Sequence, residues 1–442
     1  MSADGPAPGE RGALVRAIDT RALTFNAVNL TIGTTVYVVP ALIAAEVGRW
    51  ALVSYLACAA LMTLVVLCFA EAGSRVPSSG GSYAWVEQVF GSFAAFLLGW
   101  LLYAGGLALG AASVMQLLFR GLSDLAPIVN APVPHALLVV LILSVMAALN
   151  VRGVRRSARL VEGVTIIKLA PLAIILVTGV GGIVWSNLSL GPWPGTSSFG
   201  HSLFLVIFLF AGIENALLAS GEVADPTRSV PRAVMLALGI VTVLYLAAHV
   251  VAQGVLGDEL ARRTAAPIAD MAASRIGGVG RQLVLFAMIV APLSYLLGEL
   301  LSAPRILYAM ARDGFLPKAV ARVHDVHHTP HVAIWLHAGL VALLVLTRSF
   351  EWLAIVSSVS TLLVYLVCTL ATVQLRRREV RLMGPPFVLP LGVAIPVVAA
   401  LVMIALMFAV RRDELLAVAA MVVAGSALYG LTRVARRARP QG

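Results

Sequence analysis

Twelve long apolar stretches, nearly free of charge, limit what this 442-residue chain can fold into. A helix needs about 20 apolar residues to cross the hydrocarbon core of a bilayer. Each stretch reaches or approaches that length, so we expect an all-α polytopic membrane protein with twelve transmembrane helices. The expected spans are residues 23–45, 50–73, 93–119, 135–151, 160–185, 201–222, 233–257, 281–311, 331–347, 352–375, 387–410 and 415–432.

The composition excludes several classes of protein. Hydrophobic residues make up 60% of the chain and charged residues 12%, against about 45–50% and about 25% in soluble globular domains. So few charges cannot cover the surface of a soluble enzyme, a nucleic-acid binder or a disordered chain. The three cysteines lie in apolar runs and match neither a disulfide framework nor a zinc pattern. We therefore expect no nucleic-acid partner, no cofactor and no metal.

Basic residues are distributed unevenly over the segments between the spans. If the N-terminus lies inside, 22 of the 32 lysines and arginines fall on the cytoplasmic side, where basic residues concentrate in membrane proteins. The first 22 residues are polar and lack the apolar core of a signal peptide, so they read as a cytoplasmic tail. We expect a multi-pass protein of the plasma (inner) membrane with both termini in the cytoplasm.

Two expected spans contain sequence that disfavours a straight helix. Residues 30–40 read LTIGTTVYVVP, in which Gly33, its hydroxyl-bearing neighbours and the later proline weaken a helix. Residues 208–215 read FLFAGIEN, in which a carboxylate and an amide closely follow Gly212. Unwound backbone inside a membrane is tolerated where it lines a cavity or is buried in protein. We expect two broken helices, although either glycine could instead serve close helix packing.

The two glycines fall in the first span of two blocks of five spans. An odd number of spans inverts the second block relative to the first, an arrangement found in many secondary transporters. In such proteins, half-helix ends present N–H groups to a carboxylate and carbonyl groups to an ammonium group. A free amino acid carries both groups, so the pattern favours a transporter of amino acids or related amines.

Four further motifs follow one another along the chain. They read IGTTVYVVP at 32–40, FAEAGSRVP at 69–77 with GGSY at 80–83, GEVADPTRSVPRA at 221–233 and RILYAMARDGFLP at 305–317. Together they resemble motifs of the amino acid–polyamine–organocation (APC) permeases. The resemblance implies alternating access and a leucine-transporter-type 5+5 inverted repeat with two peripheral helices. The expected parts are a cytoplasmic tail at 1–22, repeats at 23–185 and 200–376, peripheral helices at 387–432 and a tail at 433–442.

The resemblance also implies a set of substrate-binding residues. The first unwound segment would hold the substrate's carboxylate, and the carbonyl groups of the second would take its amino group. The first segment comprises Ile32, Gly33, Thr34 and Thr35, of which Thr35 replaces a glycine of the family pattern. The second comprises Ala211, Gly212 and Ile213, with Phe208 as an aromatic lid before it and Glu214 as an acidic residue after it.

Lys168, Glu214 and Glu299 lie deep inside expected spans, where burying a charge is expensive and suggests a function. The resemblance puts Lys168 in the place of a sodium ion, which predicts sodium independence with either proton coupling or exchange. Snorkelling of Lys168 to the interface is the alternative. Glu214 would couple substrate to gate, or else brace the broken helix. Glu299 stands where many relatives carry an aromatic beside the substrate, and could accept a cationic side chain, relay a proton or pair with Arg305.

Other polar residues have a structural interpretation. Glu71, Glu222 and Arg305 lie near cytoplasmic ends of spans, as parts of an inner gate network or as interfacial anchors. His249 and His337 are expected to be packing residues with satisfied hydrogen bonds. A cluster of loop histidines has spacing that could bind a metal, but a permease motif runs through this loop and argues against a metal site. These are His324, His327, His328 and His331.

These features predict a secondary active transporter of amino acids or related amines, sodium-independent and coupled to protons. Its partners would be a small-molecule substrate, protons and membrane lipid. An amino acid/amine exchanger without proton coupling is the alternative within transport. A transporter-like nutrient sensor is the alternative from another class, while a channel or a membrane enzyme fits less well. The sequence leaves the substrate, the direction of flow and the oligomeric state open.

Overall fold

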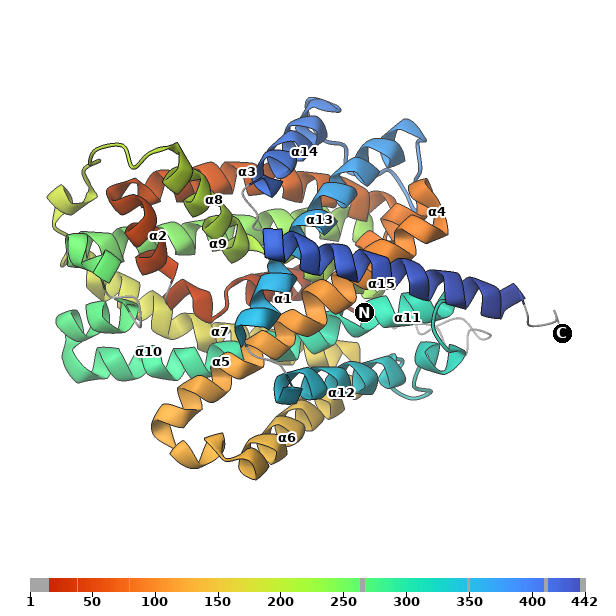
Figure 1. Ribbon diagram of the computed structural model, residues 1–442, viewed down its shortest axis with the longest axis horizontal. Helices are drawn as coiled ribbons and strands as arrows, with labels where there is room; N and C mark the ends of the chain where they lie inside the picture. Colours follow the sequence, from red (N-terminus) through yellow and green to blue (C-terminus); the bar gives the residue numbers. More distant parts are fainter. Residues whose placement is uncertain are drawn as a thin grey trace, which may run out of the picture.

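The computed structural model describes residues 16–37, 39–78, 80–262, 267–347, 350–408 and 412–437. Within these ranges every regular element is a helix, apart from an isolated bridge between Ile18 and Val223. Many of the longer helices run along the longest dimension of the molecule (Figure 1). The predicted all-α class is confirmed.

Loops and short 3₁₀ turns separate the α-helices of the chain. In the described ranges they are α1 (Thr20–Thr31), α2 (Val39–Val47), α3 (Ala51–Arg75), α4 (Ser82–Trp100), α5 (Leu109–Leu125), α6 (Pro132–Val151), α7 (Val154–Val180), α8 (Thr196–Phe210), α9 (Pro226–Leu256), α10 (Pro267–Ser302), α11 (Pro304–Arg312), α12 (His331–Thr347), α13 (Phe350–Arg377), α14 (Ala394–Met407) and α15 (Arg412–Arg437).

Several of these helices are long and apolar enough to cross a membrane. Among the described residues there are six: Val39–Arg75, Ser82–Phe119, Pro132–Val151, Ser157–Val180, Pro226–Arg262 and Pro267–Arg312. Four shorter apolar helices accompany them: Thr196–Ile207, His331–Leu346, Ala394–Met407 and Val418–Leu431. These helices make the chain a polytopic membrane protein. The length and composition of these helices do not establish that the chain has the twelve transmembrane helices expected from the sequence.

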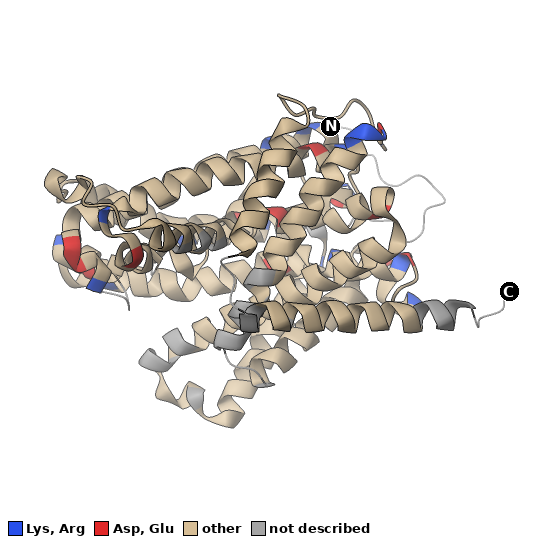
Figure 2. Cartoon of the chain, turned by 45° about the horizontal axis from the view of Figure 1, so that its top comes forward, with Lys and Arg blue, Asp and Glu red and all other residues tan. Residues whose placement is uncertain are grey.

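The outer surface suits a lipid environment. Large apolar side chains are exposed on α6, α7, α9 and α14, as at Leu137, Val177, Val243 and Leu401. Charged residues gather toward opposite ends of the molecule, and the long helical stretches between them carry few charges (Figure 2). These apolar side chains do not pack inside the protein, so we interpret them as lipid-facing.

The third and eighth expected spans are more elaborate than predicted. The third runs from α4 through a π-helical segment, Leu101–Ala108 (η3), into α5. The eighth is the later part of α10 followed by α11. Helix α10 begins before this span and is kinked at Gly277, which has a φ of +65°. The segment between the seventh and eighth expected spans is partly helical, because it contains the 3₁₀ turn Gly257–Arg262 (η7) and the beginning of α10.

Candidate functional site

The first expected helix break follows α1. This helix ends at Thr31, whose hydroxyl donates to the Ala27 carbonyl of its own helix (2.8 Å). Ile32 has extended backbone angles, and Gly33 lies outside any helix. The chain then forms the 3₁₀ turn Thr34–Tyr37 (η1) before α2. Glycine and threonine both lower helix propensity, and the predicted break is confirmed.

The second expected break follows α8. Gly212 has a φ of +123°, a conformation that residues with a Cβ rarely adopt. The 3₁₀ segment Ile213–Glu222 (η6) continues from it. A Cβ added to Gly212 would lie 2.8 Å from the carbonyl carbon of Leu30 in α1 and would collide with its oxygen. This break is also confirmed, and glycine allows it to press against the end of α1.

Tyr245 of α9 joins the two breaks. Its hydroxyl lies 2.9 Å from the Thr31 carbonyl oxygen and 2.9 Å from the Leu209 carbonyl oxygen. Both carbonyls belong to the last turn of a helix, where they have no partner within the helix. The sequence interpretation missed Tyr245, because one tyrosine in an apolar span has no distinguishing pattern.

A cavity of ≈ 110 Å³ lies between the two breaks. The segments η3, α5, α10 and α13 supply its remaining walls. Of the residues predicted from the family resemblance, those that line the cavity are Gly33, Thr34, Thr35, Ala211, Gly212 and Glu214. The structure therefore brings the two unwound segments together around one space.

Unpaired polar atoms face this region. The Thr34 hydroxyl and the Asn215 side-chain oxygen are buried and have no hydrogen-bond partner among the described residues. Both residues line the cavity. Buried polar atoms normally have a partner, so a polar ligand would satisfy them. The Glu214 carboxylate is partly engaged, because Oε2 accepts the backbone N–H of Gly212 (3.0 Å).

Lys168 of α7 reaches the end of α1 behind this cavity. Its Nζ donates to the backbone oxygen of Asn29 (2.9 Å) and to Asn29 Oδ1 (2.6 Å). The side chain is 1% exposed, so it does not snorkel to the surface. In the described chain no carboxylate forms an ion pair with it. Asn29 also donates to the Ser294 carbonyl of α10 (2.7 Å), and the sequence interpretation did not single it out.

Three of the predicted substrate-binding residues do not place side chains in the cavity. Ile32 and Ile213 pack in the hydrophobic core, so at most their backbones can serve the site. Glu299 contacts His337, and the alternative in which it pairs with Arg305 is wrong, because Arg305 pairs with Glu222. The side chain of Phe208 lies outside the described residues.

A buried ion pair lies at the far end of η6. Arg305 of α11 donates to both oxygens of the Glu222 carboxylate (2.6 and 3.1 Å), and both side chains are fully buried. The Glu222 carbonyl accepts the backbone N–H groups of Ala17 and Ile18 (2.8 and 2.9 Å). The segment before α1 is thus attached to the end of η6, the segment that follows the second break.

Glu71 anchors the end of α3. One oxygen of its carboxylate accepts from Arg75 Nε (2.8 Å), and the other accepts the backbone N–H of Leu389 (3.0 Å). Arg376 of α13 approaches the same carboxylate, at 3.4 Å. These contacts attach α3 to α13 and to the segment before α14, which supports a structural role for Glu71 inside the protein rather than at the membrane interface.

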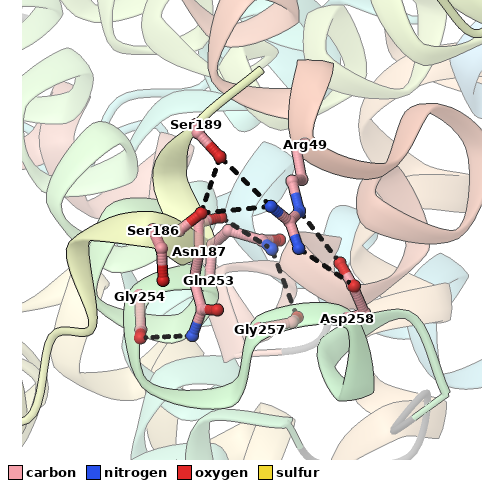
Figure 3. Close-up of polar contacts among 8 residues, drawn as sticks. All are labelled: Arg49, Ser186, Asn187, Ser189, Gln253, Gly254, Gly257 and Asp258. Atoms are coloured by element: carbon pink, nitrogen blue, oxygen red, sulfur yellow. Dashed lines mark hydrogen bonds and ion pairs between the residues drawn. The ribbon is translucent and has the colours of Figure 1, made fainter. Parts of the chain in front are cut away.

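A polar cluster at the C-terminal end of α9 joins three segments that are distant in sequence (Figure 3). Arg49, just after α2, donates to both oxygens of Asp258 in η7 (3.1 Å each). It also donates to the Ser186 carbonyl (3.1 Å). In the same view, Asn187 donates to Gly254 at the end of α9 (3.0 Å). The segment after α2 is held against the end of α9 by these contacts.

The sequence model of a family described as "Amino acid permease" matches residues 18–426, most of the chain. The chain belongs to this amino acid permease family. The resemblance to APC permeases is therefore confirmed.

Curated relatives of the permease are transporters. It is 25% identical to the methylthioribose transporter of Bacillus subtilis over 95% of this chain and 94% of the relative. It is 24% identical to the branched-chain amino acid permease BcaP of the same organism, over 84% and 83% of the two chains. It is 28% identical to the B. subtilis serine/threonine exchanger SteT, over 78% and 80%. Transport is thus the shared activity, with different substrates.

His249 and His337, both buried, differ from each other. His337 has partners on both ring nitrogens, Tyr103 and Glu299, as expected for a satisfied residue. His249 contacts the Tyr55 ring, but neither of its nitrogens has a hydrogen-bond partner in the described part of the chain. The expectation that His249 is satisfied is wrong, and nothing in the structure explains its unpaired nitrogens.

Proposed function

We propose that this permease carries an amino acid or a related amine across the plasma membrane by alternating access. The observation that carries the proposal is the cavity between the two broken helices, with buried polar atoms of Thr34 and Asn215 left unpaired beside it. Helix breaks that face one cavity are the common binding device of inverted-repeat transporters. The chain's membership in a family of permeases supports the same function.

The proposal includes twelve transmembrane helices and an inverted repeat. The breaks after α1 and after α8 occupy equivalent places in the blocks 23–185 and 200–376, and they contact each other at Leu30 and Gly212. Residues 387–432 would supply two peripheral helices. The excess of basic residues on one side supports cytoplasmic termini.

We propose a substrate without a cationic side chain. Glu299 was the residue that favoured a cationic substrate, but it is buried against His337 and does not line the cavity. Glu214 is the carboxylate that does line it. Thr34 and Thr35 begin a helical turn, where backbone N–H groups suit the substrate's carboxylate. Glu214 and the carbonyls of the second break suit its amino group.

Lys168 would replace sodium at this site. Its ammonium group is held by a backbone carbonyl and a side-chain carbonyl of Asn29, which are oxygen ligands of the kind a metal cation would use. We therefore propose sodium-independent transport coupled to protons. Exchange without proton coupling is the second candidate, because one relative, SteT, is a serine/threonine exchanger.

Uptake into proteoliposomes tests these proposals. Labelled serine, threonine, branched-chain amino acids, amines and methylthioribose would be screened in sodium-free buffer, with and without an inward proton gradient. Gradient-stimulated uptake that is lost in Lys168→Ala supports proton symport with Lys168 as the coupling residue. Uptake that needs internal substrate and ignores the gradient indicates an exchanger. A complete lack of transport would refute the carrier and favour a sensor.

A further inference from the structure

A chain of three buried polar residues connects α10, α12 and the π-helical segment η3. His337 Nε2 lies 2.6 Å from Glu299 Oε2, and His337 Nδ1 lies 3.1 Å from the Tyr103 hydroxyl. Glu299 and His337 are 0% exposed. The second carboxylate oxygen of Glu299 has no hydrogen-bond partner among the described residues. The transport scheme proposed above uses none of these three residues.

Within the described ranges no fixed positive charge neutralises Glu299. Arg305, six residues further on, is engaged with Glu222, and the Lys168 ammonium is engaged with Asn29. The ionisable groups of the described chain that interact with the pair or with its neighbour Tyr295 include two tyrosines and an acid. They are Tyr103 on η3, Tyr295 on α10 and, beyond Tyr295, Glu214 on η6. The pair must therefore balance its own charge.

A single shared proton balances that charge. The carboxylate and the imidazole are neutral together when they hold one proton between them, as an imidazolium–carboxylate pair or as two neutral groups. Losing the proton would leave a buried carboxylate with a neutral partner, and gaining a second would leave a buried cation. Either change is expensive in a low-dielectric interior. The number of protons that the pair holds therefore depends on the charges and the solvent around it.

The surroundings of the pair include the substrate cavity. Tyr295 lines the cavity, one helical turn before Glu299, and lies within electrostatic range of both Glu214 and Glu299. Gly298, next to Glu299, packs closely on α1: a Cβ there would lie 2.5 Å from Asn29 Nδ2. A movement of α1 during transport would thus change the environment of Glu299.

We infer that Glu299 and His337 share one exchangeable proton and form a proton-binding site of the transport cycle, separate from Lys168. This inference rests on the proposed proton-coupled transport. The proton would be bound and released at a carboxylate oxygen or a ring nitrogen, with no other bond made or broken. Tyr103 positions the ring by its contact with Nδ1.

The test compares two kinds of transport in proteoliposomes. Gradient-driven uptake needs the coupled proton, whereas counterflow, the exchange of labelled for unlabelled substrate without a gradient, does not. We expect His337→Gln and Glu299→Gln to lose at least 90% of the stimulation by a proton gradient and to keep counterflow. The matched control is His249→Gln, which changes an equally buried histidine that contacts neither Glu299 nor the cavity. It should keep the stimulation of the wild type.

Tyr103→Phe is the second variant, because it removes one hydroxyl and leaves the packing intact. The hydroxyl oxygen can accept from Nδ1–H of the protonated ring, so its loss should weaken proton binding. We expect the pH profile of gradient-driven uptake to move about one pH unit lower. Wild-type gradient stimulation in His337→Gln, or an unchanged profile in Tyr103→Phe, would overturn the inference while transport stands. A wild type that only exchanges would also overturn it, and a wild type without transport would instead refute the carrier.

Discussion

Gly212 lies directly against the Leu30 carbonyl, so the two helix breaks of this permease touch each other. The contact leaves no room for a Cβ at position 212, and the φ of +123° there is itself unfavourable for any residue except glycine. The broken end of α8 is therefore seated on the broken end of α1, and Tyr245 hydrogen-bonds at both ends. The geometry of the cavity depends on this contact.

We expect Gly212→Ala to abolish most transport. Backbone strain at positive φ contributes about 1–3 kcal/mol, and the collision is with backbone atoms that have little freedom to move. Initial uptake should fall at least about tenfold, with a lower midpoint of thermal unfolding. Gly239→Ala in α9 is the control, since a Cβ there meets nothing within 4 Å. Equal behaviour of the two variants would contradict the role of the contact.

Asn29→Ala should impair transport more than Asn26→Ala. Both asparagines are buried on α1, but Asn29 accepts from Lys168, whereas Asn26 donates to Ser302 (3.0 Å). A hydrogen bond to a charged group contributes about 1.5–3 kcal/mol, so losing it should reduce uptake about tenfold or more. Initial rates at subsaturating substrate measure the difference. If Asn26→Ala is the more damaging change, the Lys168–Asn29 contact does not organise the site.

The Arg49–Asp258 pair should hold one end of the permease closed with little effect on stability. The pair is partly exposed, with side-chain exposures of 29% and 78%, and ion pairs open to solvent contribute little to stability because water and salt screen them. We expect Arg49→Gln to increase, several-fold, the rate at which a water-soluble thiol reagent modifies Ser113→Cys in the cavity wall. High salt should reduce the difference in labelling rate between Arg49→Gln and the parent that keeps the Arg49–Asp258 pair.

The control for that experiment is Arg262→Gln. It breaks the exposed Arg262–Glu259 pair, which joins residues of the same short turn and no distant segments. Its labelling rate should equal that of the parent. Identical rates in Arg49→Gln and the parent would show that the pair does not restrict access.

Arg305→Met should destabilise the protein strongly, and the double change Glu222→Met with Arg305→Met should recover most of the loss. The single change leaves the Glu222 carboxylate buried without its partner, which costs about 3–5 kcal/mol. Replacing both removes the uncompensated charge. Thermal unfolding of the purified protein measures both effects. Arg312→Met, at the more exposed Arg312–Asp313 pair, should change stability by less than about 1 kcal/mol.

Local sequence predicted the parts of the site that arise from backbone chemistry. Gly33 and Gly212 stand among hydroxyl, carboxylate and amide side chains, and helix propensity alone indicated that a helix should break there. The burial of Lys168 followed from its place deep in an apolar span. The substrate-binding roles of these residues stay predictions, although six of the predicted residues meet at one cavity.

Side-chain partners could not be predicted in the same way. Glu299 was compared with Arg305 on its own segment, but its partner is His337, 38 residues away on α12. Tyr245 and Asn29 gave no signal, because a single polar residue in an apolar helix is recognisable only when its neighbour is known. Most of these helices are apolar on every face, so their hydropathy pattern does not show which faces pack against each other.

The sequence by itself determined the helical membrane class and the amino acid permease family, and it predicted the two positions at which the structure shows broken helices. These depend on local properties: the length of apolar runs, helix propensity and motifs. Only the tertiary structure decided that the breaks touch at Gly212 and Leu30, that Asn29 holds Lys168, and that Glu299 faces His337. These contacts join residues distant along the chain, and their energies depend on packing and burial that no local pattern records.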